Sequence, residues 1–163
     1  MPTINEIKVE AVKFRRLIES CDKKNTSLVI DCFPVMSCKL TSMLLSYHFL
    51  TLWPECELKG VSAATGKNSQ ITHYWLEIDN IVVDITGDQY NIINDKELNN
   101  KNYKKTGHIL PSMSYIKKVV IFITYSKIRD KEPIIHGFPT FSEDFIEEME
   151  LGYNQLFNRK RMK

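Results

Sequence analysis

The chain has 163 residues, of which 43% are hydrophobic and 26% are charged, and its formal net charge is +2 at pH 7. This length predicts one domain with a substantial core, and the small net charge argues against nucleic acid or an acidic membrane surface as the main partner. No apolar run is long enough to span a bilayer, and the first residues lack the apolar core of a secretion signal. We therefore expect a cytoplasmic protein of one domain, residues 1–163, in which the basic residues 158–163 form a solvated tail.

The amino-terminal third predicts one helix and one short extended segment. Over residues 5–20, apolar side chains recur at steps of three and four, as on one face of a helix. Thr3 followed by Glu6 is a capping-box pattern, which predicts the helix start. Residues 28–30 form a short apolar run that predicts a strand or an extended approach.

A second helix is predicted between the Phe33-Pro34 dipeptide and Pro54, with Ser37 as its N-cap. Its apolar side chains leave little of its surface suited to water, so we expect it at the centre of the fold. His48 lies among these apolar residues and is expected to be a core or edge histidine. His108 and His136 neighbour glycines in predicted loops, where surface roles are the default.

From residue 57 onward the apolar pattern becomes that of strands. Residues 58–63, 72–78 and 81–85 predict strands, and Asp79-Asn80 between the last two is a two-residue loop that favours a tight hairpin. Further on, residues 87–106 predict a loop with a short helix, residues 115–125 a strand, and residues 141–157 a helix. Helices followed by an antiparallel sheet predict an α+β fold.

Cysteine usage argues against a disulfide scaffold and against a zinc ribbon, because the thiols at positions 21, 32, 38 and 56 form no C-x-x-C pair. A free cysteine is most often a small buried hydrophobic side chain, and we expect that role for Cys21, Cys32 and Cys56. Cys38 differs because it falls in the first turn of the predicted central helix. Unpaired backbone N–H groups there favour the thiolate, which predicts a nucleophile.

The predicted hairpin brings a histidine and a carboxylate together. A turn at residues 79–80 pairs residues whose numbers sum to about 159, which sets Asp84 diagonal to His73 on the neighbouring strand. Asp84 is the only charge in residues 81–85, and an acid in such a run usually needs a partner. The alternative is a carboxylate that caps a turn at the strand end. An imidazole held by a carboxylate can take or hold a thiol proton.

Three motifs together carry a resemblance to a known superfamily. They are Phe33-Pro34-x-x-x-Cys38, then His73-Tyr74-Trp75-Leu76-Glu77-Ile78, then Val82-Val83-Asp84-Ile85-Thr86-x-Asp88-Gln89-Tyr90. In this order they resemble the transglutaminase-like branch of the papain-like cysteine enzymes. The chain departs from the usual pattern in having Met36-Ser37 before the cysteine and Tyr74, where alanine is usual, after the histidine.

The resemblance implies a papain-like α+β fold in which a helix carrying Cys38 packs on an antiparallel sheet. Cys38 would be the nucleophile, His73 the base and Asp84 the residue that orients it. Gln89 is our candidate oxyanion donor because its amide follows closely after the acid, although Asp88-Gln89 equally suits the capping of a loop. Trp75, which shares the His73 face of its strand, is the candidate substrate-binding side chain.

The function that follows is a cysteine-dependent amide hydrolase, a peptidase or deamidase, that acts on a peptide or protein through a thioester and requires no cofactor. An amine acceptor would make the same triad a transglutaminase or N-acyltransferase. Two other classes remain open: a zinc hydrolase with Cys, His and Asp ligands, and a catalytically inactive binding or immunity-type protein of the same fold. Neither nucleic acid nor a membrane is expected as a partner.

Overall fold

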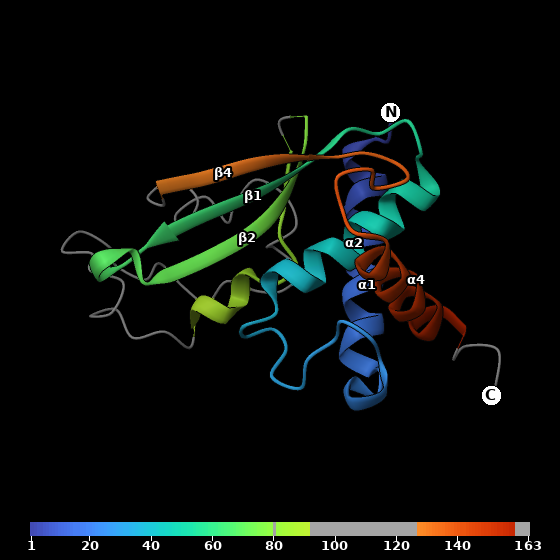
Figure 1. Ribbon diagram of the computed structural model, residues 1–163, viewed down its shortest axis with the longest axis horizontal. Coiled ribbons are helices and arrows are strands. Elements are labelled where there is room, and N and C mark those ends of the chain that lie inside the picture. The colour runs from blue at the N-terminus through green and yellow to red at the C-terminus, as the bar shows by residue number, and fades with distance from the viewer. Residues whose placement is uncertain (80, 92–126, 159–163) are drawn as a thin grey trace.

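The computed structural model describes residues 1–79, 81–91 and 127–158 (Figure 1). In these ranges the chain has the predicted α+β architecture, with three α-helices and one four-stranded antiparallel sheet. The helices are α1 (Ile4–Ser20), α2 (Cys38–Leu52) and α4 (Glu143–Asn158). The strands are β1 (Leu58–Thr65), β2 (Ile71–Ile78), β3 (Ile81–Val83) and β4 (Lys127–Ile134), in the order β3-β2-β1-β4.

Helix α1 begins where the capping-box pattern predicts. Thr3 Oγ1 accepts a hydrogen bond from the N–H of Glu6 at 3.3 Å, and the Glu6 carboxylate accepts one from the N–H of Thr3 at 2.7 Å. The apolar face of α1 buries Ile7, Ala11, Phe14 and Ile18 in the core. The capping box therefore predicted the start of the helix, and of the apolar positions that carried the periodicity Ile7, Phe14 and Ile18 are buried whereas Ile4 and Val9 are exposed.

The segment between α1 and α2 contains no strand, so the strand interpretation of residues 28–30 is wrong. Leu28 has a positive φ of 59°, and the N–H of Val29 bonds to the carbonyl of Thr26 at 3.2 Å. These are turn contacts, and Val29 alone enters the core as a buried side chain. Three apolar residues in a row do not distinguish a strand from a turn that anchors one side chain.

Helix α2 lies at the centre of the fold, as its apolar composition predicts. Met43, Leu44, Leu45 and Phe49 are fully buried. Ser37 occupies the N-cap position, but its hydroxyl donates to the carbonyl of Pro34 at 2.8 Å and makes no side-chain bond to the helix. The predicted start is confirmed, whereas the predicted capping bond is not formed.

The hairpin register is the one predicted, since Leu76 pairs with Val83 and Ile78 with Ile81. Pairing stops at Val83, two residues before the predicted strand end, because Asp84 begins a turn that leads into the short 3-10 helix η3 (Gly87–Asn91). The predicted strand at residues 115–125 and most of the predicted loop at 87–106 lie outside the described residues. The C-terminal helix begins at Glu143, two residues later than predicted.

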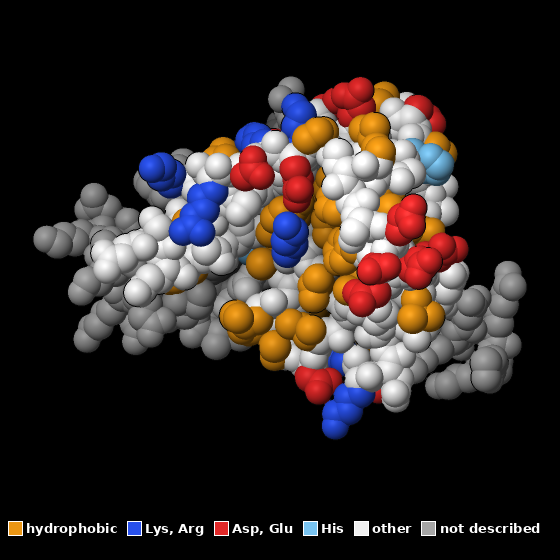
Figure 2. Space-filling model, in the orientation of Figure 1, with side chains coloured by type: hydrophobic (Ala, Val, Ile, Leu, Met, Phe, Trp, Pro, Cys, Tyr) orange, Lys and Arg blue, Asp and Glu red, His pale blue; other side chains and the backbone are white. Residues whose placement is uncertain are grey.

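Charge is distributed unevenly over the surface. Strand β4, which pairs with β1 at the edge of the sheet, exposes Lys127, Arg129 and Lys131. Exposed acidic side chains gather on α4, as Figure 2 shows; they are Glu143, Asp144, Glu147, Glu148 and Glu150. Among the helices that the structure describes, none combines the length and apolarity needed to cross a bilayer.

Candidate active site

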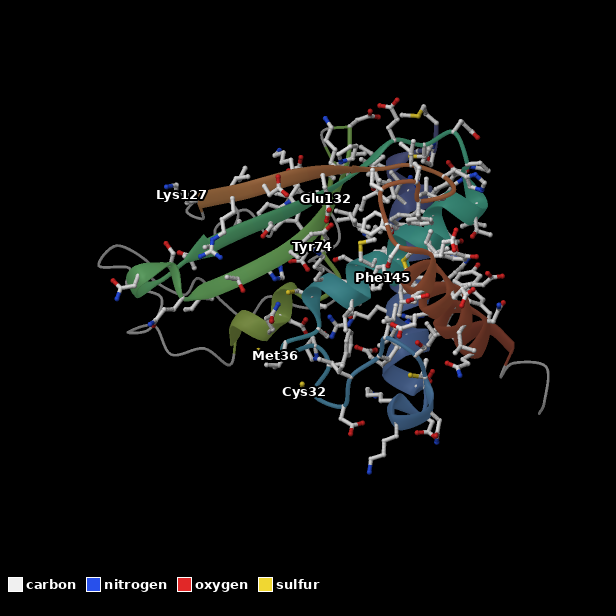
Figure 3. The ribbon with its side chains drawn as sticks, in the orientation of Figure 1. Cys32, Met36, Tyr74, Lys127, Glu132 and Phe145 are labelled. Carbon is white, nitrogen blue, oxygen red and sulfur yellow. The ribbon has the colours of Figure 1, made fainter. Side chains whose placement is uncertain are left out.

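Cys38 is the first residue of α2, and its side chain is partly exposed. The first turn of a helix leaves backbone N–H groups without intrahelical partners, and Cys38 belongs to that turn. Of the other three thiols, Cys56 is buried and Cys21 is partly buried. Cys32 is exposed on the loop before α2, where Figure 3 shows it near Met36, so the expectation of a buried Cys32 is wrong.

His73 lies on β2, opposite Ala63 of β1, and its side chain is fully buried. Its Nε2 lies 2.6 Å from Oδ2 of Asp84, so the diagonal placement inferred from the hairpin register is correct. Cys38 lies close enough to His73 to contribute to the raised pKa of the ring. The structure thus brings the three predicted residues into one array, in which the imidazole bonds to the carboxylate and lies near the thiol.

Both interpretations of Asp84 hold at once. Oδ1 accepts hydrogen bonds from the N–H and the hydroxyl of Thr86, at 2.9 and 3.1 Å, which caps the turn after β3. Oδ2 is turned toward His73. Asp84 and Thr86 are both fully buried, so each carboxylate oxygen has the partner that burial demands.

The charge balance at this array favours the imidazolium. Burial of His73 disfavours the charged ring, but the Asp84 carboxylate and its hydrogen bond outweigh that effect. The nearby Cys38 acts in the same direction as Asp84, and together these groups raise the pKa of His73 from 6.5 to about 9. At neutral pH the ring therefore holds a proton.

Gln89 lies at the ring nitrogen of His73 that does not bond to Asp84. Its Nε2 is 3.0 Å from Nδ1 of His73, its side chain is buried, and its backbone N–H bonds to the carbonyl of Thr86 at 3.0 Å. The amide donates to Nδ1 when the ring is neutral. When Nδ1 carries a hydrogen, the Gln89 NH₂ cannot donate to it, and an amide turned by 180° would accept from it through Oε1.

Trp75 is fully buried, so it offers no surface to a substrate in this structure. Its ring centroid lies 5.9 Å from that of His73, at an interplanar angle of 35°, and its other neighbours include Val61 and Ala63. The predicted substrate contact is therefore not available. The side chain instead supports one side of the imidazole ring.

Tyr74, the departure from alanine beside the histidine, points to the opposite face of β2. Its hydroxyl donates to Oε1 of Glu132 on β4 at 2.6 Å, and Figure 3 labels the two side chains close together. Gly60 on the intervening strand makes this contact possible, because a Cβ at that position would clash with the tyrosine hydroxyl. The substitution therefore changes the far face of the strand and leaves the His73 face unaltered.

The remaining histidines follow their predicted roles where the structure describes them. His48 is a core histidine, buried between the rings of Phe14 and Phe157, and its ring nitrogens lie 3.3 Å from the Tyr153 hydroxyl and 3.2 Å from Glu10. His136 is exposed. His108 lies outside the described residues.

The sequence did not predict the roles of three residues that hold the segment around Asp84. These are Thr86, which bonds to Asp84, and the ion pair of Arg15 with Asp88. Arg15 donates two hydrogen bonds to the Asp88 carboxylate, at 2.7 and 2.8 Å. One signal was present in the sequence. Arg15 lies between Ala11 and Ile18 on the apolar face of α1, and a buried arginine needs an acidic partner.

Within residues 1–79, 81–91 and 127–158, no group of three His, Cys, Asp or Glu side chains is placed to hold a metal ion. The described residues therefore give no support to the zinc-hydrolase alternative. Comparison of the chain with protein-family models, curated proteins and solved structures found no match in any of the three.

Proposed function

We propose that this protein is a cysteine-dependent amide hydrolase, a peptidase or deamidase, of papain-like and specifically transglutaminase-like architecture. The observation that carries the proposal is the position of His73, which bonds to Asp84 through Nε2 and lies near enough to Cys38 for the thiol to affect its pKa. The placement of the thiol at the start of a central helix, and of the histidine and acid on and after adjacent strands, supports the architecture.

The proposed reaction begins with attack of the Cys38 thiolate on an amide carbonyl carbon. The carbonyl electron pair moves to oxygen, and the N–H of Cys38 and the amide of Gln89 are the available donors for that oxyanion. Collapse of this intermediate breaks the C–N bond while the His73 imidazolium gives its proton to the leaving amine. The products of this half-reaction are a thioester on Cys38, a free amine and a neutral His73.

Hydrolysis completes the cycle. Water attacks the thioester carbonyl as His73 Nδ1 takes a proton from it, and the carbon–sulfur bond breaks to return the thiolate and release the carboxylic acid. Asp84 stabilises the imidazolium at both stages. An amine that enters in place of water would give acyl transfer with the same residues.

The first test is selective alkylation with iodoacetamide at pH 7, read for each cysteine by mass spectrometry. The exposed Cys32 is an internal control for access, because Cys38 is less exposed. We expect Cys38 to react at least about tenfold faster than Cys32, and His73→Ala to remove that difference. Equal rates at the two thiols, unchanged by His73→Ala, would indicate a catalytically inactive protein.

The second test identifies the reaction. Wild type and Cys38→Ala are each incubated with a proteome digest, and products that need the sulfur are identified by mass spectrometry. Cleaved or deamidated peptides support hydrolysis, whereas cross-linked or acylated amines would replace it with transfer. Acyl adducts on Cys38 at the mass of a peptide fragment would trap the thioester itself.

A further inference from the structure

A buried arginine ties the amino-terminal helix to the segment that carries the acid. Arg15 of α1 is 4% exposed, and its guanidinium donates to both carboxylate oxygens of Asp88, at 2.7 and 2.8 Å. The same group donates to the backbone carbonyl of Ile85 at 2.6 Å, and its Nε bonds to Glu19 at 2.8 Å. We call the contacts of Arg15 with Asp88 and Ile85 the α1 clamp.

The α1 clamp falls between the two residues that flank the imidazole. Asp84, which bonds to Nε2 of His73, directly precedes Ile85, and Gln89, which lies at Nδ1, directly follows Asp88. A shift of this short segment would move both His73 partners together. Two parallel N–H···O bonds to a planar carboxylate fix direction as well as distance, which a single contact does not.

The same arginine also touches the segment that leads to the thiol. The guanidinium carbon lies 5.1 Å from the centre of the Phe33 ring, in the loop that enters α2 five residues later at Cys38. Arg15 therefore contacts both the segment that follows Asp84 and the loop that leads to Cys38. A buried ion pair contributes little net stability compared with well-packed apolar residues, so stability alone is a weak reason for this arrangement.

We propose that Arg15 is a positioning residue, which holds residues 85–88 so that Asp84 keeps His73 aligned with Cys38 and Gln89 keeps its place at Nδ1. The inference rests on the proposed function for its catalytic meaning. Its geometric content, the dependence of the Asp84–His73 contact on the α1 clamp, can be measured without any substrate.

The test compares two clamp variants, Arg15→Lys and Asp88→Asn, with two controls. Lysine keeps the charge but loses the bidentate geometry, and asparagine keeps the shape but loses the charge. Glu19→Gln alters the exposed contact of Arg15 and leaves the α1 clamp intact. Ile7→Val removes one methylene from the same helix at a fully buried position, and so lowers stability without touching the clamp.

The primary measurement is the titration of the His73 ring by nuclear magnetic resonance, with the unfolding midpoint of each variant recorded alongside. Among the described residues, the side chains that face this ring include Cys38, Asp84, Gln89 and Trp75. In both clamp variants we expect the pKa of His73 to fall by about one unit or more, because its carboxylate partner loses alignment. Alkylation of Cys38 at pH 7 should slow by about tenfold, and both controls should titrate as wild type.

The proposal is overturned if both clamp variants lower the unfolding midpoint, as Ile7→Val does, while His73 titrates as in the wild type. Should Arg15→Lys fail to fold, Asp88→Asn decides, because it leaves Arg15 bonded to Ile85 and Glu19. Failure of the proposed function looks different: wild-type Cys38 is then alkylated no faster than Cys32, whatever the His73 titration shows.

Discussion

Thr86 donates two hydrogen bonds to one oxygen of Asp84, from its backbone N–H at 2.9 Å and from its hydroxyl at 3.1 Å. The second carboxylate oxygen is therefore turned toward Nε2 of His73, 2.6 Å away. All three side chains are buried, so water does not compete for these bonds. The turn that ends β3 thus also sets the orientation of the imidazole, because the Thr86 bonds to Asp84 direct its other oxygen toward His73.

Asp84→Asn tests this relationship directly. The asparagine oxygen can still accept from Thr86, but its NH₂ then faces Nε2 and drives the ring proton to Nδ1, the nitrogen that should receive the thiol proton. We expect the pKa of His73 to fall from about 9 toward 6.5, and the alkylation of Cys38 at pH 7 to slow by about tenfold or more.

Asp79→Asn is the matched control, since it makes the same chemical change at the exposed turn of the same hairpin, where a φ of 51° suits asparagine. It should titrate and alkylate as wild type. If Asp84→Asn did the same, the carboxylate would have no part in the state of the ring.

Gln89→Ala separates two reactions of the same sulfur. Iodoacetamide is attacked at a saturated carbon and forms no oxyanion, whereas p-nitrophenyl acetate passes through a tetrahedral oxyanion. Loss of a single oxyanion donor typically slows acyl transfer by about 10²–10³-fold. We expect that loss for the acylation of Cys38 by the ester, with alkylation within about threefold of wild type because Gln89 does not hold Asp84.

Equal slowing of both reactions would assign Gln89 to the alignment of His73, whose Nδ1 it contacts. Gln89→Glu is a useful companion variant. It keeps the size of the side chain but places an acceptor where a donor is needed, so acylation should remain slow.

The hairpin shows how far local rules reach. Its two-residue turn set the register, and the register placed Asp84 beside His73 across the strands. The capping pattern of Thr3 and Glu6 set the start of α1 in the same way. In each case the contacts lie within about a dozen residues of one another, so backbone geometry decides them without knowledge of the rest of the fold.

What the sequence did not disclose depends on contacts between distant segments. Strand β4 is rich in exposed charges and was not predicted, because its place is decided by backbone pairing with β1 at the sheet edge and not by an apolar pattern. The bond between Arg15 and Asp88 joins residues 73 positions apart. Periodicity shows that a charged side chain lies on the apolar face of a helix. Only the folded structure shows which carboxylate forms the ion pair with it.

Gly152→Ala tests the contact between α4 and the loop that follows α1. A Cβ at this position would clash with the backbone carbonyl of Ser27, and it would lie 3.2 Å from a methyl group of Leu44. The Ser27 N–H also bonds to Gln155 at 2.7 Å, so the loop is held close to the helix. Because a backbone carbonyl cannot move aside like a side chain, we expect a loss of about 1–3 kcal/mol in the free energy of unfolding, measured in urea.

Gly137→Ala is the contrasting variant, because nothing lies within 4 Å of its added Cβ and only its φ of +82° opposes the change. Its cost should be about 1 kcal/mol and should leave α4 undisturbed. A Gly152→Ala protein as stable as the wild type would mean that the helix and the loop do not meet as closely as described.

The two buried histidines predict opposite pH dependences of stability. For His73 the folded-state pKa, about 9, lies above the unfolded value of 6.5, so its contribution is fully present below pH 6.5 and is lost as the pH rises toward 9. A shift of this size corresponds to a free energy on the order of 3 kcal/mol. His73→Gln should flatten the decline in unfolding free energy between pH 6.5 and 9, and a decline of equal slope in the variant would contradict the raised pKa.

His48 acts in the acidic range. Burial lowers its pKa below 6.5, although the nearby Glu10 carboxylate opposes that effect. Below pH 6.5 the His48 ring binds a proton in the unfolded chain but stays neutral in the folded protein. The free energy of unfolding therefore falls as the solution is acidified. Chemical unfolding of wild type and His48→Gln at pH 6.5 and pH 5.5 measures this term. The variant should be less stable at both pH values, but its free energy of unfolding should fall less on acidification. An equal fall in the two proteins would mean that a group other than His48 causes the pH dependence.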